Sequence, residues 1–441
     1  MRILIFLVSA VFVTTITGCS TETEQRPPNI VLVMADDLGY ETLGVNGSTS
    51  YETPRLDDLA SRGMRFTQAF SMPLCTPSRV QIMTGRYNFR NYVGFGMLDP
   101  EETTFAHLLK NAGYVTGIVG KWQLWGNTRQ REMFGRTGTK PNDAGFDEYF
   151  LWQIEEKYGS RFKDPHIEIN GDPVQEFEGA YGPDLYTRYA EDFMDRHQEE
   201  PFFLYFPMTL THDPFQPLPG DSLYERFELS DQFNDAQYFG GYVSYMDGLM
   251  GRLVDKLESL DLADNTLFLF TGDNGTDRKV VSQTTTGEIA GNKGYTTGSG
   301  THVPLIAWWP GRIPEGVVND NLIDFTDFLP TLLDAAGVET PQGHVLDGLS
   351  FFPQLVSEAD SVRQWIFCHY ASMWGFPDRR YAQTAEWKLY ESGAFHYLPD
   401  DPLEENPLPV DELDVKGREV YEMLSGVFDS MPGAFENTSV E

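Results

Sequence analysis

Short apolar runs alternate with longer amphipathic stretches along most of this chain, and this alternation constrains the fold more than any other feature. Such runs are typical of buried strands, and the longer stretches are typical of helices. Strands that alternate with helices form a largely parallel sheet with helices on its faces. We therefore expect an α/β fold with a large mixed, mainly parallel sheet flanked by helices. The expected strands are Asn29–Ala35, Tyr114–Gly120, Phe202–Pro207, Thr266–Phe270 and Val303–Trp309.

The amphipathic stretches predict the helices. Pro77 precedes one of them and is expected at its first helical position, where a missing backbone N–H costs nothing. The expected helices are Pro54–Arg62, Ser78–Thr84, Thr103–Asn111, Leu185–Gln198, Tyr238–Ser259 and Asp324–Ala336.

The pattern changes after about residue 345. Residues 378–398 are typical of a hairpin that turns at residues 391–393, and a helix is expected over Val415–Phe428. We therefore expect a main domain over residues 28–345 and a smaller C-terminal α+β subdomain over residues 346–441. Arg379, Arg380 and Lys388 in this part are expected to be solvated surface charges.

The N-terminus is typical of an export signal. Arg2 gives it a positive start, and residues 3–16 are almost wholly apolar but short for a membrane-spanning helix. The following Cys19 completes a stretch that resembles the lipobox of bacterial lipoproteins. We expect a signal peptide over residues 1–19 and a polar tether over residues 20–27. A lipid on Cys19 would be the sole membrane attachment, in the periplasm or at the outer membrane or cell surface; an ordinary cleaved signal is the alternative.

Charge and cysteine content narrow the function. The chain has 66 acidic and 32 basic residues, which gives a net charge of −34 and makes nucleic acid an improbable partner. An anionic substrate would require the basic residues to gather at the site. Of the three cysteines, Cys368 is expected to be a small buried hydrophobic residue, so disulfides are not expected to hold the fold together.

Polar clusters follow four of the expected strands. They are Asp36-Asp37, Lys121-Trp122-Gln123, Thr211-His212-Asp213 and Asp273-Asn274. Taken alone, each is typical of a turn or a helix cap. In an open α/β sheet, however, ligands bind beyond the carboxyl ends of the strands, so the four clusters are expected to meet at one rim and form a functional site.

The clusters also predict a metal site. Asp36, Asp37, Asp273 and Asn274 all offer hard oxygen ligands, which disfavours zinc. They suit calcium or magnesium, and side-chain oxygens from two distant loops favour calcium.

The residues around Cys75 carry a resemblance to a known family. Cys75-Thr76-Pro77-Ser78-Arg79, with Thr84-Gly85-Arg86 further on, is similar to the signature of the type I sulfatases in the alkaline phosphatase superfamily. The resemblance covers most of residues 28–400 and implies an alkaline phosphatase-like fold with residues 28–345 as its catalytic domain. Other stretches that carry it are MADDLG, GKWQ, THDPF, TGDNG, GNKG, HVPLIAWWPG and DGLSFFPQL.

The resemblance implies that Cys75 is converted to Cα-formylglycine by a maturation enzyme that reads the unfolded chain. One hydroxyl of the hydrated aldehyde would attack sulfur, and the other would let the sulfated intermediate collapse and expel sulfate. Cys75 would then also be a metal ligand. A buried structural cysteine and an unmodified reactive thiol, activated by the helix dipole, are the alternatives.

The resemblance also implies roles for the basic residues. Arg79 would steady the hydrate. Lys121 and Lys293 would pair with sulfate oxygens, and His212 would bind sulfate and protonate the departing oxygen.

Two departures from the family pattern stand out. Gln123 occupies the position of a usual histidine, so it can hydrogen-bond to substrate but cannot take a proton. Residues 298–302 read Gly-Ser-Gly-Thr-His where Glu-Gly-Gly-x-Arg is usual, and we expect the loss of both charges to alter local support and one edge of the pocket.

The resemblance and the export signal imply a sulfated carbohydrate as substrate. The aromatic stretches 150–152 and 370–376 are candidates for stacking on sugar rings, with core packing as the alternative. Two other functions stay open. One is a formylglycine-dependent phosphodiesterase or phosphonate monoester hydrolase, and the other is a sulfoglycan-binding lipoprotein without turnover.

Overall fold

The computed structural model describes the chain between residues 26 and 431 apart from short gaps. The predicted signal peptide over residues 1–19, Cys19 and most of the predicted tether lie outside the described residues. Among the described helices, none has the length and apolar character needed to cross a bilayer. The described residues are 26–152, 154–155, 159–227, 233–358 and 363–431.

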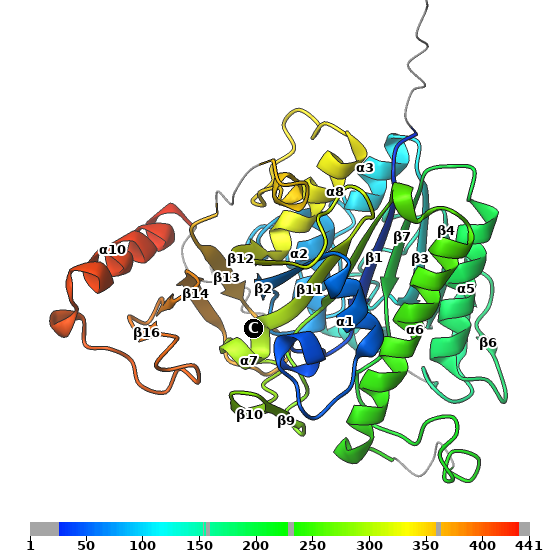
Figure 1. Ribbon diagram of the computed structural model, residues 1–441, viewed down its shortest axis with the longest axis horizontal. Helices are drawn as coiled ribbons and strands as arrows, with labels where there is room; N and C mark the ends of the chain where they lie inside the picture. The colour runs from blue at the N-terminus through cyan, green and yellow to red at the C-terminus, as the bar shows by residue number, and fades with distance from the viewer. Residues whose placement is uncertain (1–25, 153, 156–158, 228–232, 359–362, 432–441) are drawn as a thin grey trace, which may run out of the picture.

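A sheet of ten described strands runs through the centre of the molecule (Figure 1). In chain order these strands are β1 (Asn29–Ala35), β2 (Met64–Phe70), β3 (Val115–Lys121), β4 (Glu148–Trp152), β5 (His166–Ile169), β6 (Gln175–Glu176), β7 (Phe202–Pro207), β8 (Thr266–Gly272), β11 (His302–Trp308) and β12 (Val317–Asp324). Their order across the sheet is β12-β2-β11-β8-β1-β7-β3-β4-β5-β6. β8, β1, β7, β3 and β4 are parallel neighbours, whereas β11 is antiparallel to β2 and β8. The sheet is mixed and mainly parallel, as the sequence predicts.

Helices cover both faces of this sheet (Figure 1). The α-helices of the described residues are α1 (Pro54–Ser61), α2 (Cys75–Thr84), α3 (Phe105–Asn111), α4 (Thr128–Phe134), α5 (Gly182–Arg196), α6 (Phe239–Ser259), α7 (Gly298–Thr301), α8 (Phe328–Ala336), α9 (Phe352–Leu355) and, beyond the main sheet, α10 (Val415–Ser430). Ile30 and Leu32 of β1 pack in one core with α2, α3 and α8, while Val31 and Val33 pack in another with α1, α5 and α6. A strand buried on both faces reads as a continuous apolar run, which is why β1 is visible in the sequence.

The sequence predicts some elements and misses others. β1 and β7 have the predicted bounds, and β3, β8 and β11 differ by one or two residues at an end. β2, β4 and β12 are not among the predicted strands. β12 is the edge strand, reads VVNDNLID and is half exposed, so it lacks an apolar run. The helix predicted over Asp324–Ala336 begins instead with a 3-10 turn at Phe325–Asp327 before α8.

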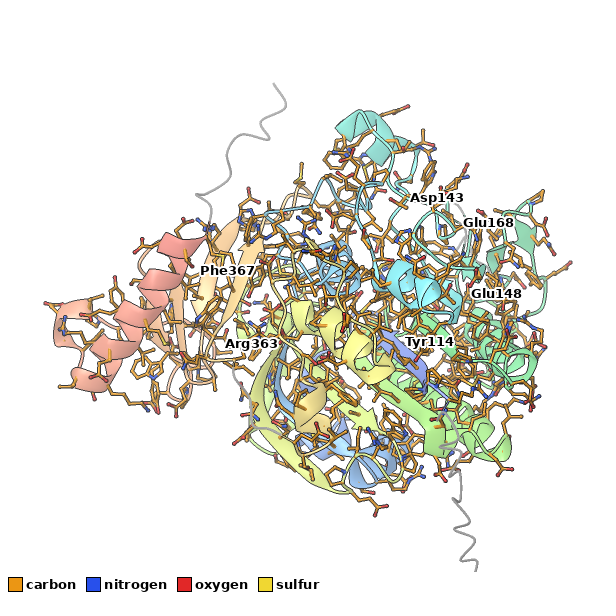
Figure 2. The ribbon with its side chains drawn as sticks, turned by 90° about the horizontal axis from the view of Figure 1, so that it is seen from above. Tyr114, Asp143, Glu148, Glu168, Arg363 and Phe367 are labelled. Atoms are coloured by element: carbon orange, nitrogen blue, oxygen red, sulfur yellow. The ribbon has the colours of Figure 1, made fainter. Side chains whose placement is uncertain are left out.

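The C-terminal part forms a second, antiparallel sheet with α10 against it (Figure 1). Its strands are β13 (Ile366–Tyr370), β14 (Arg379–Gln383), β15 (Trp387–Tyr390) and β16 (Phe395–Tyr397). Figure 2 places Arg363 and Phe367 where this sheet meets the main body. One face packs on α10, and the other packs on Phe70, Met72 and Leu74, which lead into Cys75. The predicted α+β subdomain is present, and its exact boundary near residue 345 stays a prediction.

Two basic side chains of this sheet are buried, so the prediction that they are solvated surface charges is wrong. Lys388 is fully buried and pairs with Glu404 at 3.0 Å. Arg380 is buried as well and pairs with Glu391. Each cation has a carboxylate partner, which is the condition for burying a charge.

The remaining short strands, β9 (Val281–Thr284) and β10 (Gly287–Ala290), form a separate hairpin.

Candidate active site

Four neighbouring parallel strands end at one rim of the main sheet, and a predicted polar cluster follows each. Asp36 and Asp37 follow β1, Lys121 ends β3, His212 lies beyond β7, and Asp273 follows β8. The strands lie side by side in the order β8-β1-β7-β3. Residues that are far apart in the sequence therefore meet at the carboxyl ends of the strands, the usual place for a ligand in an open α/β sheet.

Cys75 reaches the same rim from a fifth strand. β2 is antiparallel to β11, which is antiparallel to β8, so β2 and β8 point in the same direction. After β2 the chain turns and α2 begins at Cys75, which is 2% exposed. Pro77 is therefore the third residue of the helix, whereas the sequence predicts it at the first helical position. Because the N–H groups of the first turn have no partner within a helix, proline is tolerated there.

The centre of the rim is a buried group of oxygen-bearing side chains. Asp36, Asp37, Asp273 and Asn274 have no solvent exposure. The backbone N–H of Asp37 donates to Asp273 Oδ1 at 2.9 Å, and Asn274 Nδ2 donates to Asp37 Oδ1 at 2.9 Å. These bonds fix the two loops against each other and hold the carboxylates close together.

Basic side chains balance these carboxylates. Lys121 Nζ contacts both oxygens of Asp36 at 2.9 and 2.7 Å. Arg79 Nη2 lies 2.9 Å from Asp273 Oδ2, and Nη1 donates to the carbonyl of Lys121 at 3.1 Å. Arg79 and Lys121 are both about 1% exposed, so each is held by the ion pairs rather than by water.

His212 and Lys293 share the carboxylate of Asp37. Lys293 Nζ donates to Asp37 Oδ2 and lies 3.0 Å from His212 Nε2, while Nδ1 of His212 faces Asp213 Oδ1 at 2.9 Å. Burial and the nearby lysine oppose protonation of the imidazole. The negative charge of Asp37 outweighs them and raises the pKa of His212 to about 9. The imidazole is therefore protonated at neutral pH.

The donor set fits a hard divalent cation. One ligand atom from each of Asp36, Asp37, Cys75 and His212 lies within 4.8 Å of the others. Asn274 Oδ1 is buried and, in the part of the chain that the structure describes, accepts no hydrogen bond. A carbonyl oxygen left in this way beside carboxylates is the kind of ligand that calcium takes. The identity of the ion belongs to the proposal below.

The pKa values of Asp36 and Asp273 are shifted in opposite directions. Burial alone would raise the pKa of Asp36, but Lys121, His212 and Arg79 hold it well below its usual range. Burial and the charge of Asp36 instead raise the pKa of Asp273 well above the usual value. The charge of a divalent cation would favour the ionised form of both carboxylates.

The thiol of Cys75 lies in a cationic environment. Burial would raise the pKa of Cys75, but the charges of Lys121 and Lys293 lower it to about 6. The same charges that stabilise a thiolate would stabilise other anionic oxygens or sulfate at this position. The alternative of an inert structural cysteine, as at Cys368, does not fit these surroundings: burial there raises the pKa of the thiol.

Gln123 lies where the sequence places it, at the edge of the reaction pocket. This pocket has a volume of about 270 Å³ and is lined by Cys75, His212 and Lys293 as well as Gln123. The backbone of Gln123 has a left-handed φ of 56°. Its Oε1 is buried and has no hydrogen-bond partner among the described residues, so the amide can hydrogen-bond to a ligand in the pocket.

The second departure does not reach the pocket directly. His302 is the first residue of β11 and stacks between Tyr40 and Phe70, with ring centroids 4.0 and 5.0 Å away. Its Nε2 lies 2.9 Å from the carbonyl of Thr67. Burial lowers the pKa of His302 to about 4, so the imidazole is a neutral packing element at neutral pH.

The loop that carries Lys293 is held by the C-terminal sheet. Lys388 Nζ donates to the carbonyl of Thr296, and the carboxylate of Glu404 accepts the backbone N–H of Gly298 at 2.9 Å. Sequence reasoning missed this support because Lys388 and Glu404 lie about a hundred residues beyond the loop.

Sequence reasoning also missed Arg161. Its guanidinium stacks on Trp152 at 4.2 Å, and Nη1 lies 3.8 Å from Asp36 Oδ2. The residue lies outside the described helices and strands and carries no motif, so no signal in the sequence points to it. All ten site residues named from the sequence lie at the rim, and Arg161 adds a further cation there.

Comparisons with known proteins agree with this geometry. A family model described as Sulfatase matches residues 28–338, and one described as N-sulphoglucosamine sulphohydrolase, C-terminal matches residues 292–404. The chain is 34% identical over 374 residues to N-acetylgalactosamine-6-sulfatase of Canis lupus familiaris, covering 75% of this chain and 66% of the relative. It is 34% identical over 375 residues to arylsulfatase A of Homo sapiens, covering 78% and 70%. The crystal structure of Ps i-CgsB in complex with k-i-k-neocarrahexaose has a TM-score of 0.73 and 26% identity, covering 94% of this chain and 96% of that one.

The fold and the rim define the class: an α/β protein of the alkaline phosphatase superfamily, with a polar site at the carboxyl ends of its strands. The chain belongs to the sulfatase family, a family of sulfuric ester hydrolases. It spans 66% of the length of the first of these relatives.

Proposed function

We propose that this protein removes sulfate from a sulfated carbohydrate, with a formylglycine made from Cys75 as nucleophile and a calcium ion at the rim. The observation that carries the proposal is the position of Cys75. It begins a helix at the bottom of the reaction pocket, close to Asp36, Asp37 and His212. This arrangement gathers acidic metal ligands and cations around a single modifiable side chain.

The basic residues of the rim suit a sulfate ester. A sulfate monoester is an anion, so its oxygens must be neutralised before a nucleophile can approach. Lys121 and Lys293 present ammonium groups at the rim, and their contacts with Asp36 and Asp37 fix their positions. This support explains how an acidic protein binds an anion: the positive charges gather where the ester must lie.

His212 supplies the proton. Its imidazole is held by Asp213 through Nδ1, which leaves Nε2 directed toward Asp37 and Lys293. Because the pKa of His212 is raised to about 9, Nε2 carries a proton at neutral pH. It can therefore protonate the leaving oxygen as the ester bond to sulfur breaks.

The groups that the family implies would complete the site. Asp36, Asp37, Asp273 and Asn274, with residue 75, would hold calcium, which when bound supplies a Lewis acid for anionic oxygens. The formylglycine, once formed, supplies a geminal diol whose second hydroxyl allows sulfate to leave. Arg79 lies on the same helix, one turn beyond residue 75, and its bonds to Asp273 and the Lys121 carbonyl fix that turn.

A carbohydrate substrate is supported by the pocket and by the relatives. Trp374 and Phe376 line the reaction pocket beside Cys75, and Trp152 lines the adjoining one. Aromatic faces of this kind stack on sugar rings. N-acetylgalactosamine-6-sulfatase is named for a sulfated sugar, and Ps i-CgsB was crystallised with a neocarrahexaose. We also propose that the chain is exported and held to a membrane through a lipid on Cys19.

Sulfate release by ion chromatography tests this function. The chain is produced with a formylglycine-generating enzyme and incubated with sulfated oligosaccharides from chondroitin, heparin and carrageenan, and in parallel with aryl phosphate diesters and a phosphonate monoester. Release of sulfate that is lost in Cys75→Ala supports the proposal. Faster hydrolysis of the phosphorus esters would favour the alternative hydrolase, and tight binding without release would favour a binding protein.

A further inference from the structure

An outer pocket adjoins the cavity next to the reaction pocket, and two residues line both this cavity and the outer pocket. This outer pocket has a volume of about 330 Å³, in the range of small-ligand sites. Trp152 and Arg161 line it, and both also line the cavity that contains Lys121, Gln123 and His212. A ligand that fills both spaces would therefore contact these two side chains.

Arg161 lines both the outer pocket and the cavity at the rim, and its Nη1 has no close partner among the described residues. Its side chain is 10% exposed, and Nη1 is buried and makes no hydrogen bond with any residue that the structure describes. The nearest carboxylate oxygen, Asp36 Oδ2, is 3.8 Å away and is already bound by Lys121 at 2.7 Å. A buried guanidinium normally has close, bidentate partners, so this one has unused donors.

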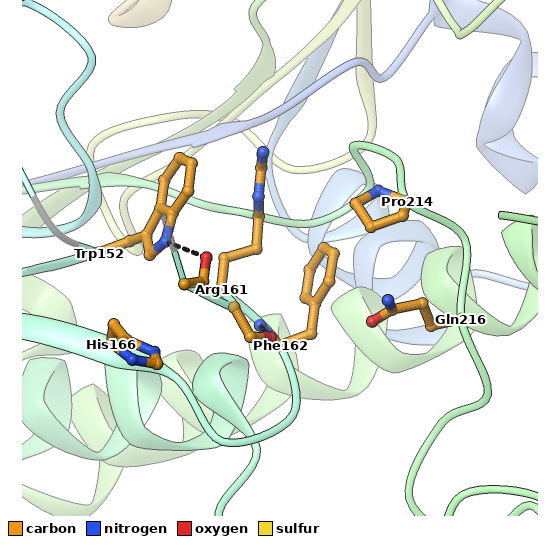
Figure 3. A pocket seen from close by; sticks show the side chains of 8 residues that line it. Trp152, Arg161, Phe162, His166, Pro214 and Gln216 are labelled. Carbon is orange, nitrogen blue, oxygen red and sulfur yellow. Dashed lines mark hydrogen bonds between the residues drawn. The ribbon is translucent and has the colours of Figure 1, made fainter. Parts of the chain in front are cut away.

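The indole of Trp152 fixes the direction of this guanidinium. The guanidinium carbon lies over the indole, 4.2 Å from the ring centroid, and the aliphatic part of Arg161 runs beside the indole (Figure 3). The indole N–H donates to the carbonyl of Gly159 at 3.3 Å, which ties the ring to the turn before Arg161. Stacking of this kind pre-orients the charge and leaves the guanidinium edge free to bind an anion.

The rest of the outer pocket offers polar atoms that also lack partners. His166 Nδ1 and Gln216 Oε1 are buried and have no hydrogen-bond partner among the described residues. Both residues line the pocket, and Figure 3 shows them on opposite sides of Phe162. Several unpaired polar atoms around one hollow suit an oxygen-rich ligand such as a sugar ring.

Charge indicates what that ligand carries. Lys121 and Lys293 at the rim would already face the single negative charge of a sulfate monoester. A further buried cation beside the next pocket suits a substrate with more than one negative charge. We propose that Arg161, oriented by Trp152, binds a second anionic group of the substrate: a carboxylate or a further sulfate on the sulfated sugar or on the ring next to it.

This inference rests on the proposed function for the identity of the first anion, but its test does not require turnover. The unmatured chain, with Cys75 as a thiol, is titrated by calorimetry with chondroitin, heparin and carrageenan disaccharides. Each doubly anionic disaccharide is paired with one that lacks the second charge. One set removes a sulfate, and the other reduces the uronate carboxylate to an alcohol, so that the two sources of charge are distinguished.

The expected result is a preference for the doubly anionic member of at least one pair by about 10- to 100-fold in Kd, the range of a charge-assisted hydrogen bond. Arg161→Gln removes this preference, and Arg161→Lys keeps part of it because it retains the charge. Arg62→Gln is the matched control, since Arg62 also lies over a tryptophan, Trp308, at 5.2 Å, but is 36% exposed and lines neither pocket. Thermal unfolding of each variant checks that it is folded.

Three results would overturn the inference: no preference in any pair, a preference that survives Arg161→Gln, or an equal loss of affinity for both members. The last would mean that Arg161 binds the sulfate that is removed. Trp152→Leu gives a second test, because losing the stacking platform should reduce the same preference while the charge remains. The matured chain could also show the Arg161-dependent preference but release no sulfate. That result would support the subsite and refute the proposed function.

Discussion

The buried carboxylates of the active-site rim differ from another buried acidic pair, Asp324 and Asp327, at the base of the C-terminal sheet. All of these side chains are almost completely removed from water. Asp324 accepts bonds from the backbone N–H of Thr326 at 2.9 Å and from Gln81 at 2.8 Å. The fold itself supplies the partners of this pair.

Asp327 completes that second group. Arg363 forms a bidentate ion pair with Asp327. The carboxylate of Asp327 also accepts hydrogen bonds from the backbone N–H groups of Asp324 and Leu349, at 2.9 and 2.7 Å. Burial raises the pKa of Asp324 to about 6, so part of its charge is lost near neutral pH. This group caps a 3-10 turn and joins two parts of the chain.

At the rim the acidic side chains face one another. Asp36 and Asp37 converge with Cys75 and His212 on a small volume, Asp273 Oδ1 accepts the backbone N–H of Asp37, and Asn274 Oδ1 has no partner among the described residues. Packing like charges together costs stability unless a cation binds between them. The comparison therefore teaches that buried acids held mainly by backbone N–H groups and a single arginine serve structure, whereas acids that gather with several basic side chains beside a pocket serve a ligand.

The largest expected effect is on catalysis at the rim. Asp37→Asn should lower kcat for sulfate release by about 100- to 1,000-fold, because it removes a metal ligand and the anion that holds Lys293 and His212. Asp37 has a left-handed φ of 62°, which asparagine tolerates well. The thermal midpoint without calcium should stay close to wild type, since one of several like charges is removed. A near-normal kcat in this variant would show that Asp37 has no role in the active site.

Asp327→Asn should have the opposite consequence. It leaves Arg363, which is 5% exposed, without its full carboxylate partner, so the free energy of unfolding should fall by about 3 to 5 kcal/mol. Urea denaturation measures this loss, and kcat per folded molecule should equal that of wild type. A large drop in kcat with unchanged stability would contradict the structural assignment of this pair.

Calcium should separate the two groups by its effect on stability. At a free concentration about 100 times its Kd, calcium stabilises the folded chain by about 2.7 kcal/mol, which calorimetric unfolding with and without a chelator would detect. The shift should be present in Asp327→Asn and absent in Asp37→Asn. An equal shift in both variants would place the ion elsewhere.

The smallest effect is on the pH profile. His212 acts as an acid, so its protonated form is active and kcat/KM should be constant through neutral pH and then fall as the pH rises through about 9. The decline should approach tenfold per pH unit. His212→Gln should lower kcat/KM at neutral pH and abolish the alkaline limb. A limb that persists in this variant would assign the proton to another group.

Much of the site is predictable from sequence because short motifs follow strands. The sequence alone places Asp36, Cys75, Lys121, His212 and Asp273 at one rim, since parallel strands all end on the same side. The buried central strands are equally visible as apolar runs. These features depend on local patterns and on one rule of topology.

What the sequence does not predict depends on long-range contacts. The edge strand β12 is polar, so no periodicity marks it. Lys388 looks like a surface charge until the fold brings Glu404 and Thr296 to it. Arg161 lies at the rim but outside the described helices and strands, and only its packing on Trp152 shows its position. Burial and pairing of charges are tertiary properties, and no local pattern encodes them.

The central claim is that residue 75, once oxidised, is the nucleophile of a sulfate ester hydrolase. The most direct test prepares samples with different degrees of maturation, measures the fraction of formylglycine at position 75 by peptide mass spectrometry, and measures sulfate release from the same samples. The account predicts that release is proportional to the converted fraction and extrapolates to zero when Cys75 remains a thiol. Release that is independent of that fraction would contradict it.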